Sequence, residues 1–532
     1  MSRPTPRQKP RPVQDAAPVP AWASFAVGGV FLVLYLVWAP VASGDGDSSE
    51  FTVVLATLGL AHPTGYALYT LLGHAFVVAL HAFGAGWARA ANAWSAVGGG
   101  VALGLWHAIG ARSLRREGVD GTRACWVALL PAVAFGMNPV WTAGATLAEV
   151  TSWHLAWVAG ACLLALTTID ALPARRADQA WLARRAALWG VLLGLGGAHH
   201  ATSVLVAVPL TVALVVAARP SRVPWLAPAA AGALVLLAAW SYVLYRSIHP
   251  AAVQWGSLGP GLRETWNHVS AAGYRHYLGG FRPSPEQRVL LSSYVYPWLA
   301  PGLIAVALWP LASSRRSRGA RWALAAAAFL PTAYVLGYGV ADPATYFLPP
   351  LALGAFLLPT AAHALGPVRR FSRPLVAFGA VGLVFAAWSW NAVALERRVT
   401  FAGLDGFLRT MWRAVPIQRG YVLWDDDMSY RLVQYQRLEH EKPALVVVRP
   451  LLLMDAGARE LFARRHGFDP LGGASPPSEA EADSPERIQA FAEQIGDGIN
   501  RSTPDSVILF LPREPSLRLL TKPAAGVPSA PR

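Results

Sequence analysis

The chain has 532 residues, of which 54% are hydrophobic and only 14% are charged. An ordinary soluble domain carries about 25% charged residues, so this composition excludes such a domain and indicates a mainly α-helical, polytopic membrane protein. The net charge is +15, but the arginines fall in short clusters between apolar segments rather than along one helix face. That pattern is typical of membrane topology, and we expect no nucleic-acid partner.

Residues 1–21 are rich in proline and arginine and are predicted to be a disordered cytoplasmic tail. The following apolar run, 22–42, is long enough to cross a bilayer and has no clear small-residue cleavage site, so we expect a retained first span. With the basic tail inside, the next loop faces outward. Cys125 and Cys162 lie in apolar runs, which argues against a disulfide framework or a cysteine metal site.

The arginine clusters decide how the remaining apolar segments are counted. The segments 49–61 and 64–84 are predicted to be helices in the outer interface, because counting the second as a span would place the cluster at 112–123 outside. We therefore expect a transmembrane domain at 22–394, with a first outer loop at 43–90 and a long outer loop at 246–292. It has about eleven spans, near 22–42, 91–111, 124–143, 150–169, 187–200, 202–218, 224–245, 294–312, 322–340, 345–365 and 375–394.

The composition changes after residue 395. Three strand-like runs, Gly420 to Leu423, Ala444 to Val448 and Ser506 to Leu511, alternate with polar helical stretches, which predicts a small α/β domain at 395–515. An odd number of spans from an inside start places this domain outside the cytoplasm. Residues 516–532 are predicted to be a flexible tail. The acidic run Trp424 to Asp427 fits either a ligand site at a strand tip or a solvated turn.

A polar stretch directly follows the first span. Asp47 and Glu50 are three residues apart, so a helix starting at Ser48 or Ser49 brings both carboxylates to one edge of its first turn. The sequence from His62 then breaks the chain, since Pro63 restricts the residue before it. Carboxylates at a membrane face are costly unless they have a function. An ordinary helix cap followed by a loop is the alternative interpretation.

Other polar residues map to the same predicted side of the membrane, where chance would scatter them over both faces. A catalytic or binding cavity open to the extracytoplasmic side explains this distribution. Nucleotide-activated sugars and ATP are absent there, and the chain has no Walker-type phosphate loop, no hydrolase elbow and no zinc-protease helix motif. The residues in question are Asp47, Glu50, His62, Glu149, His199, His200, Arg246, His268, Arg275, Asp342 and Tyr346.

Several motifs carry a family resemblance. GDSSEF (46–51) followed by LGLAHPTGYALYTLLG (58–73) resembles the opening signature of a family of polytopic membrane proteins that includes the transmembrane protein O-mannosyltransferase. Supporting motifs extend the resemblance over roughly 22–440: AEVTSWHL, GGAHHAT, YRSIHPAAVQWG, NHVSAAGYR and DPATYFLPP. Ser49, Ala67 and Thr151 depart from the usual family residues, which weakens any transfer of acceptor specificity. The family is similar to the GT-C glycosyltransferases, multi-span enzymes that use polyprenyl-phosphate sugars.

The resemblance implies an integral membrane glycosyltransferase that moves a mannose-like hexose from a lipid-linked donor to a protein or glycan hydroxyl. Asp47 is then the base, with Glu50 orienting the acceptor or the sugar. A like charge three residues away raises the pKa of one carboxylate toward the working range. For Glu50, an interaction with the helix dipole is the alternative. We expect no cofactor. A divalent metal held by Asp47, Glu50 and a histidine is the less favoured alternative.

The remaining candidates are assigned to donor and substrate binding, each beside a structural alternative. His62 and Tyr66 lie in the first motif, where His62 binds phosphate or sugar or else caps the turn. Glu149 either binds or caps a helix, and at most one of His199 and His200 faces the donor. Arg246 and Arg275 are candidates for phosphate binding, and snorkelling of the Arg246 side chain to the lipid head groups is the alternative. Trp255 either stacks on a sugar or belongs to an interfacial aromatic belt. Asp342 either binds substrate or pairs with an arginine, and the last candidates are His268 and Tyr346.

Two other classes of function remain open. A transporter or flippase of a lipid-linked sugar is also polytopic and basic, but it favours polar or helix-breaking residues near the membrane midplane. A membrane-anchored sensor would bind its ligand in the outer C-terminal domain and would leave Asp47 without a role.

Overall fold

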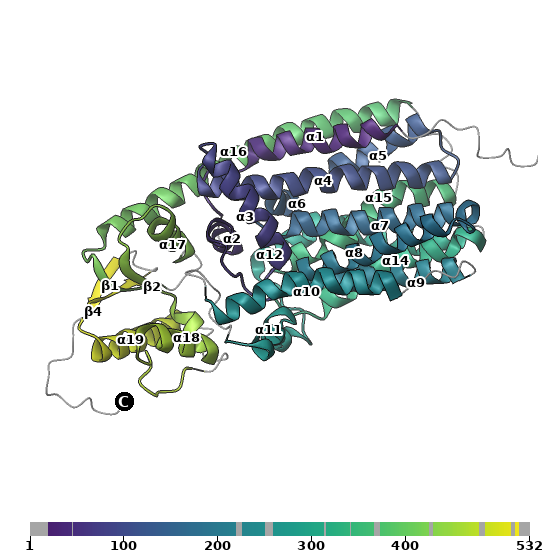
Figure 1. The fold of residues 1–532 in the computed structure, drawn as a ribbon. Coiled ribbons are helices and arrows are strands. Elements are labelled where there is room, and N and C mark those ends of the chain that lie inside the picture. Colours follow the sequence, from purple (N-terminus) through teal and green to yellow (C-terminus); the bar gives the residue numbers. More distant parts are fainter. Residues whose placement is uncertain are drawn as a thin grey trace, which may run out of the picture.

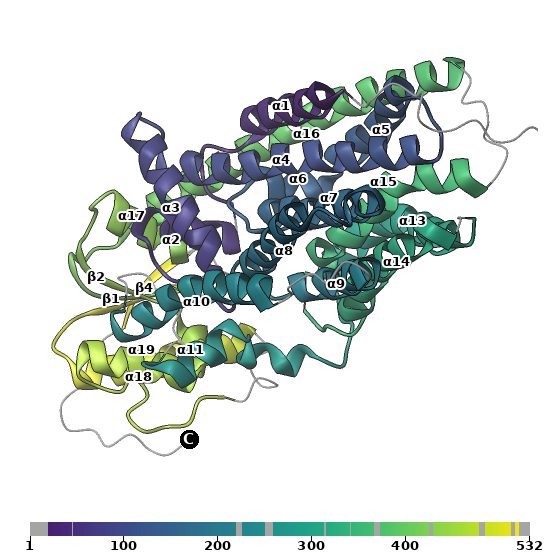
Figure 2. The same cartoon turned by 45° about the vertical axis from the view of Figure 1, so that its right-hand side comes forward.

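A computed structural model describes residues 20–44, 46–219, 226–250, 259–312, 315–340, 342–365, 373–424, 429–477, 485–511 and 516–520. Long helices run side by side to form a bundle (Figures 1 and 2). The bundle contains α1 (Ala21–Trp38), α4 (Trp87–Arg116), α5 (Gly121–Gly136), α6 (Pro139–Thr146), α7 (Thr151–Arg175), α8 (Gln179–His199), α9 (Ser203–Ala218), α10 (Leu226–Ile248), α13 (Tyr296–Leu308), α14 (Arg315–Leu336), α15 (Leu348–Leu365) and α16 (Arg373–Ala414).

Shorter elements gather at one end of the bundle. Here α2 (Asp47–Thr57) and α3 (Ala67–Ala82) confirm the two helices predicted after the first span, and α2 begins one residue before the predicted start. The predicted long loop at 246–292 is largely helical, because it contains the end of α10 and three further elements. These are α11 (Leu262–Val269), η3 (Ala272–Tyr277) and α12 (Pro285–Leu290). Two further turns, η4 (Leu291–Val295) and η6 (Pro343–Phe347), precede α13 and α15, whereas η5 (Trp309–Ala312) follows α13 at the other end of the bundle, next to Glu117.

Six helical segments in the described ranges are long and apolar enough to cross a membrane. They are Ala21–Trp38, Thr151–Arg175, Ala227–Ile248, Pro285–Ala312, Arg318–Leu336 and Pro343–Leu365. A helix occupies each of the eleven predicted stretches, but the count of eleven spans stays a prediction. α4 is not among the six, since its glycines, Asn92 and His107 lower its mean hydropathy, and α9 is short.

The stretch 124–143, predicted to be a single span, contains two helices, and its crossing of the membrane stays a prediction. α5 and α6 meet at an angle of 76°, so together they form either one broken span or a re-entrant loop. Asn138 caps α6, since its side-chain oxygen accepts hydrogen bonds from the backbone N–H groups of Val140 and Trp141. Pro139 takes the first helical position, where its missing N–H costs nothing. The Asn-Pro pair therefore starts a new helix inside an otherwise continuous apolar run.

The largest core cluster lies between the long helices. Tyr35 is fully buried there, and its hydroxyl donates to the carbonyl of Gly136 at 2.9 Å while accepting from the indole of Trp141 at 2.7 Å. These bonds tie α1 to both sides of the α5–α6 break. The aromatic rings of Trp106 and Phe356 stack nearby, with centroids 5.7 Å apart. Satisfied polar groups and interlocked rings fix the end of the bundle on which the short helices rest.

The C-terminal region contains a four-stranded sheet in the order β2-β1-β3-β4. The strands are β1 (Arg419–Leu423), β2 (Ala444–Val448), β3 (Val507–Leu511) and β4 (Ser516–Leu520), so the three predicted strands are present. β1 is parallel to both β2 and β3, with Val422 opposite Val447 and Ile508, and β4 is antiparallel to β3. Residues 516–520, predicted to be part of a flexible tail, instead form β4, which pairs with the full length of β3.

Helices cover both faces of this sheet. On one face, α18 (Ala456–His466) and α19 (Pro485–Ser502) pack Phe462 and Phe491 into the core, next to the turn η7 (Pro450–Met454). The other face meets α17 (Ser429–Leu438) and the end of α16. α16 continues without a break past residue 395, where the sequence predicted the domain boundary, and ends at Ala414. The sheet lies at the same end of the bundle as α2 and α3 (Figures 1 and 2).

Candidate active site

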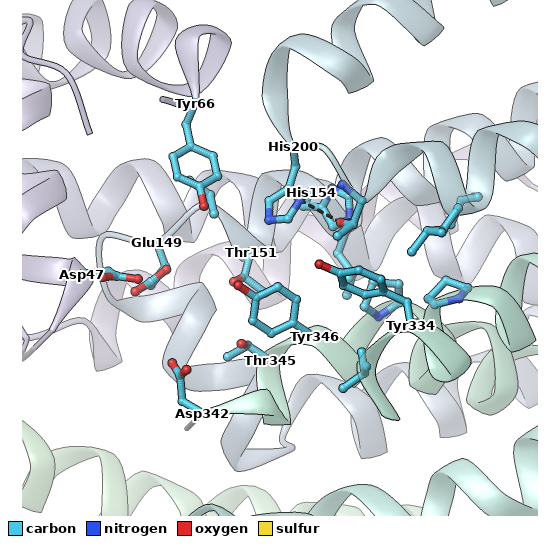
Figure 3. Close-up of a pocket in the computed structure, with 18 of the residues that line it drawn as sticks. Asp47, Tyr66, Glu149, Thr151, His154, His200, Tyr334, Asp342, Thr345 and Tyr346 are labelled. Atoms are coloured by element: carbon cyan, nitrogen blue, oxygen red, sulfur yellow. Dashed lines mark hydrogen bonds between the residues drawn. The ribbon is translucent and has the colours of Figure 1, made fainter. Parts of the chain in front are cut away.

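A cavity opens between α2, the start of α7, the α8–α9 junction and the end of α14. It measures about 840 Å³, counted together with the solvent at its mouth. Three carboxylates lie on one side, and histidines and tyrosines face them (Figure 3). The polar and aromatic lining consists of Asp47, Phe51, His62, Tyr66, Glu149, Thr151, His154, His200, Thr202, Tyr334, Asp342, Thr345 and Tyr346.

The first turn of α2 presents Asp47 to this cavity. Gly46 precedes it with φ of +56°, a conformation that favours glycine. The carbonyl of Gly46 accepts hydrogen bonds from both the backbone N–H and the hydroxyl of Ser49, at 3.3 and 2.9 Å. The Asp47 side chain remains 52% exposed. A helix start therefore holds a half-exposed carboxylate at the cavity, where the helix dipole favours its negative charge.

Glu50 lies behind His62 rather than in the cavity wall. Its side chain is only 2% exposed, and its carboxylate accepts from the His62 backbone N–H at 2.7 Å and contacts His62 Nδ1 at 2.9 Å. The other ring nitrogen, Nε2, lies 3.2 Å from the Tyr66 hydroxyl and 3.8 Å from Asp47 Oδ2. Glu50 thus fixes the position and the ring orientation of His62, and His62 links the two acidic side chains of α2.

The pKa of His62 depends on two opposing effects, the burial of its ring and its attraction to nearby carboxylates. Burial by itself lowers the pKa of His62, but the nearby carboxylates of Asp47 and Glu50 outweigh it and raise the pKa to about 10. Burial raises the pKa of Glu50, and the positive imidazolium opposes that rise. At neutral pH the ring of His62 is therefore an imidazolium, which lies between the acidic side chains of Glu50 and Asp47.

Tyr66 reaches the cavity from a strained backbone position. It precedes α3 with φ of +42°, a left-handed conformation that is rare for a bulky side chain. Its ring packs edge-on against Phe51, with centroids 5.6 Å apart, and against His62 at 5.1 Å. Such strain persists only where surrounding contacts enforce it, and it is common at functional sites. Here it directs the hydroxyl toward His62 Nε2.

Glu149 supplies the second carboxylate of the cavity. Asn92 on α4 positions Glu149. The side-chain N–H group of Asn92 donates to the carbonyls of Pro40 and Ala42, and the side-chain oxygen of Asn92 accepts from the backbone N–H of Ala148. One residue therefore joins the segment before Asp47 to the segment before Glu149. Burial, and next the charge of Asp47, raise the pKa of Glu149 well above its ordinary value. Burial therefore favours the protonated form of Glu149.

The opposite wall combines two predicted residues, His200 and Tyr346, with three that the sequence prediction missed, His154, Thr202 and Tyr334. His154 and His200 lie with ring centroids 4.7 Å apart, and both contact the hydroxyl of Thr202, at 3.3 and 2.7 Å respectively. Tyr334 and Tyr346 also face this space (Figure 3). A buried histidine within an apolar helix is a signal that was available for His154, which lies in the AEVTSWHL motif.

The structure brings together seven of the predicted site residues: Asp47, His62, Tyr66, Glu149, His200, Asp342 and Tyr346. Three others pack outside the lining. His199 Nε2 lies 3.3 Å from the carbonyl of Val150, and His268 Nε2 lies 3.1 Å from that of Ala61. Arg246 donates to the carbonyl of Leu58 at 2.6 Å and lies over the rings of two tyrosines.

Arg275 is exposed on η3 and is not part of the lining described for the cavity. Trp255 lies outside the described residues. Asp47, Glu50 and His62 each offer one ligand atom within 4.8 Å of the others. This set of two oxygens and one nitrogen suits a divalent metal. Glu50 and His62 already share a proton in their hydrogen bond, which occupies one possible ligand atom of each. The expected absence of a cofactor stays a prediction.

The C-terminal region supports the helix that carries Asp47. α17 packs against α2, and its fully buried Arg431 donates through Nη2 to the carbonyl of Ser43. The Ser43 hydroxyl donates to Gln434 Oε1 at 3.3 Å. Tyr430 joins the same core cluster as Phe51. The segment that leads into Asp47 is therefore held by side chains nearly 400 residues away in sequence.

Residues 47–223 match the family model described as the Protein O-mannosyl-transferase TMEM260 N-terminal domain. The resemblance predicted from the sequence is confirmed. The TMEM260-type segment contributes α2, the loop to Tyr66, Glu149 and the His154–His200 wall, and so most of the cavity. Among curated proteins, no sequence is significantly similar to the chain.

A solved structure shares the fold of the whole chain. ArnT from Cupriavidus metallidurans, bound to undecaprenyl phosphate, superposes with a TM-score of 0.53 at 14% identity, over 92% of this chain and 93% of that one. Its apo form gives 0.49 at 14% identity, with the same coverage of both chains. The Archaeoglobus fulgidus oligosaccharyltransferase, tethered to an acceptor peptide, gives 0.48 at 12% identity over 92% of this chain and 69% of that one. The bound ArnT structure shows that the likeness extends beyond the matched segment.

Proposed function

We propose that the protein is a membrane glycosyltransferase. It transfers a hexose, mannose-like by the family resemblance, from a polyprenyl-phosphate donor to a hydroxyl of a protein or glycan on the extracytoplasmic face. The observation that carries the proposal is the half-exposed carboxylate of Asp47 at the cavity, backed by the imidazolium of His62 and, behind it, Glu50. The match to an O-mannosyltransferase family model and the fold shared with an undecaprenyl-phosphate-binding protein support it.

The reaction is a direct displacement at the anomeric carbon. Asp47 takes the proton of the acceptor hydroxyl as its oxygen forms a bond to that carbon. The bond from the anomeric carbon to the phosphate oxygen breaks, and its electron pair leaves with the polyprenyl phosphate. An exposed carboxylate can meet both the acceptor and water, whereas buried Glu50 cannot reach either. In this arrangement Asp47 is the base, and Glu50 is a positioning residue.

The departing phosphate requires positive charge or hydrogen-bond donors. Among the described residues that line the cavity there is no arginine or lysine, so Arg246 and Arg275 do not serve the phosphate in this arrangement. The donors that line the cavity include the His62 imidazolium, the hydroxyls of Tyr66 and Tyr346, and the carboxyl of Glu149, whose protonated form burial favours. A carboxylic acid kept neutral by burial donates a hydrogen bond without repelling phosphate.

The test uses the purified full-length protein with radiolabelled polyprenyl-phosphate mannose and glucose and with candidate acceptor peptides and glycans. Asp47→Asn should lower label transfer by about 10²- to 10⁴-fold, as expected for loss of a general base. Asp497→Asn, an equivalent change at an exposed position of α19, is the matched control and should transfer at the wild-type rate. Equal transfer by wild type and Asp47→Asn would contradict the role of Asp47. No transfer from either donor would contradict the glycosyltransferase proposal.

A further inference from the structure

A second, larger cavity lies at the end of the bundle away from Asp47. It is a groove between α1, α4 and α7, which lie side by side in Figure 1, and it measures about 1860 Å³ with the solvent at its open side. Its long walls are apolar and include Phe25, Leu32, Val101 and Leu163. Two of the three helices, α1 and α7, are candidate membrane spans, so the molecules that surround this groove are lipids.

Close helix packing forms the floor of the groove. At Gly28 an added Cβ would lie 2.8 Å from the carbonyl oxygen of Gly100, and at Gly100 it would lie equally close to that of Gly28. The backbones of α1 and α4 therefore touch at these two glycines. Gly29, one residue along, has no atom within 4 Å of where its Cβ would stand.

Charge is concentrated at one end of the groove. Arg112, Arg115 and Arg116 of α4 line it together with a single carboxylate, Asp170 of α7. Arg112 Nε lies 3.5 Å from Asp170 Oδ2, and Arg116 contacts the same oxygen. Arg112 and Arg116 share this one carboxylate, so these two guanidinium groups together leave an excess of one positive charge, and Arg115 lines the groove beside them. Phosphate esters are the anions that guanidinium groups recognise best.

The length of the groove matches one leaflet. Ala21 and Leu32 mark its extent on α1, and eleven helical residues rise roughly 17 Å. Half of a bilayer's hydrocarbon core is about 15 Å thick. Residue Glu149 of the Asp47 cavity is held by Ser95 near the start of α4, roughly 25 Å of helix from Arg112. The arginine end therefore lies at the opposite membrane face.

We propose that this groove binds an anionic phospholipid of the leaflet opposite to the Asp47 cavity. Its phosphate lies at Arg112, Arg115 and Arg116, and an acyl chain lies along α1 over Gly29. The positive-inside pattern alone accounts for arginines at this face but not for a groove beside them. Arg175 and Arg176, which contribute to the same pattern at the end of α7, are not among the residues that line the groove. They provide a matched comparison.

The test measures lipid retention by native mass spectrometry on the full-length protein in detergent, with added phosphatidylglycerol or phosphatidylcholine. Wild type should retain phosphatidylglycerol preferentially. Arg112→Gln with Arg115→Gln should weaken retention about tenfold or more, while Arg175→Gln with Arg176→Gln should not. Gly29 lines the groove and its added Cβ would meet no atom within 4 Å, so Gly29→Phe should place a ring in the groove and block the acyl chain.

Three results would overturn the proposal. They are equal retention of the two lipids, loss of retention in the control pair as much as in the groove pair, and full retention in Gly29→Phe. Glycerophosphate, which has the headgroup phosphate but no acyl chain, should not compete at millimolar concentration. Competition at that level would assign the site to a free phosphate rather than to a lipid.

Discussion

His62 is the residue on which the charge of the site depends. Its imidazolium is favoured by Asp47 and Glu50, which raise its pKa from 6.5 to about 10 despite burial. A histidine with a raised pKa stabilises the folded state fully below its ordinary pKa, and this contribution is lost as the pH rises through the folded value. The ion pair therefore persists at neutral pH and disappears near pH 10.

Replacing Glu50 by glutamine removes the closest of these two charges. Glu50→Gln should lower the pKa of His62, because the side chain still hydrogen-bonds but no longer attracts the imidazolium. The alkaline limb of the transfer rate, expected near pH 10 in wild type, should shift to lower pH in Glu50→Gln, while Asp47 remains in place to act as base. pH–rate profiles of the two proteins measure this. A slower variant with an unshifted limb would mean that Glu50 only packs.

Glu149 differs from Asp47 in its expected protonation. Because burial raises the pKa of the Glu149 carboxyl and so favours its uncharged form, Glu149→Gln should replace one uncharged donor by another of similar shape. Transfer at pH 7 should stay within about tenfold of wild type, far above the 10²- to 10⁴-fold loss expected for Asp47→Asn. Side-by-side rates of the two variants decide the point. A loss in Glu149→Gln as large as in Asp47→Asn would show that Glu149 works as a carboxylate.

At the scale of elements, α2 shows how much of the site was predictable. The three-residue spacing of Asp47 and Glu50 placed both on the first turn of one helix, which the structure confirms. Spacing within a helix does not reveal which neighbour each side chain meets. Glu50 faces His62, which lies in the loop after α2, and this loop folds back over the helix. The burial of Glu50 therefore depends on the path of the loop, which no local sequence pattern specifies.

Tertiary contacts also determine which of the predicted arginines and histidines lie in the cavity. Arg246 and Arg275 fitted phosphate by chemistry, yet Arg246 binds a backbone carbonyl and Arg275 lies on the surface. His199 and His200 are adjacent in sequence but contact different partners. The sequence predicted that at most one of them faces the donor, but it did not indicate which one. Each of these outcomes depends on distances between helices that lie far apart in the chain.

α17 gives a prediction about the contact between the C-terminal region and α2. Arg431→Leu removes the bond to Ser43 and leaves that carbonyl buried, at a cost of about 1.5–3 kcal/mol for a charged hydrogen bond. Both thermal stability and transfer rate should fall, because the segment that positions Asp47 loosens. Arg437→Gln, an exposed position on the same helix, should leave both unchanged. Unaltered transfer in Arg431→Leu would separate α17 from the site.

At the scale of the whole molecule, the cavity, α3 and the C-terminal sheet share one end of the bundle, while the arginine-rich turns lie at the other (Figures 1 and 2). The proposed reaction needs the first end to face away from the cytosol, where lipid-linked sugars are the available donors. The charge pattern predicts that orientation. It also places the lipid groove in the cytoplasmic leaflet, so a single measurement of sidedness bears on both proposals.

Single cysteines read that orientation directly. In a Cys125→Ser background, Phe83→Cys after α3 and Gln489→Cys on α19 occupy exposed positions at the cavity end, and Ala177→Cys is exposed between α7 and α8 at the other end. A membrane-impermeant maleimide applied to intact cells should label the first two, and should label Ala177→Cys only after permeabilisation. Cys162 is fully buried and should stay unlabelled throughout. The reverse pattern would place Asp47 in the cytosol, where nucleotide sugars are available, and would remove the reason for a lipid-linked donor.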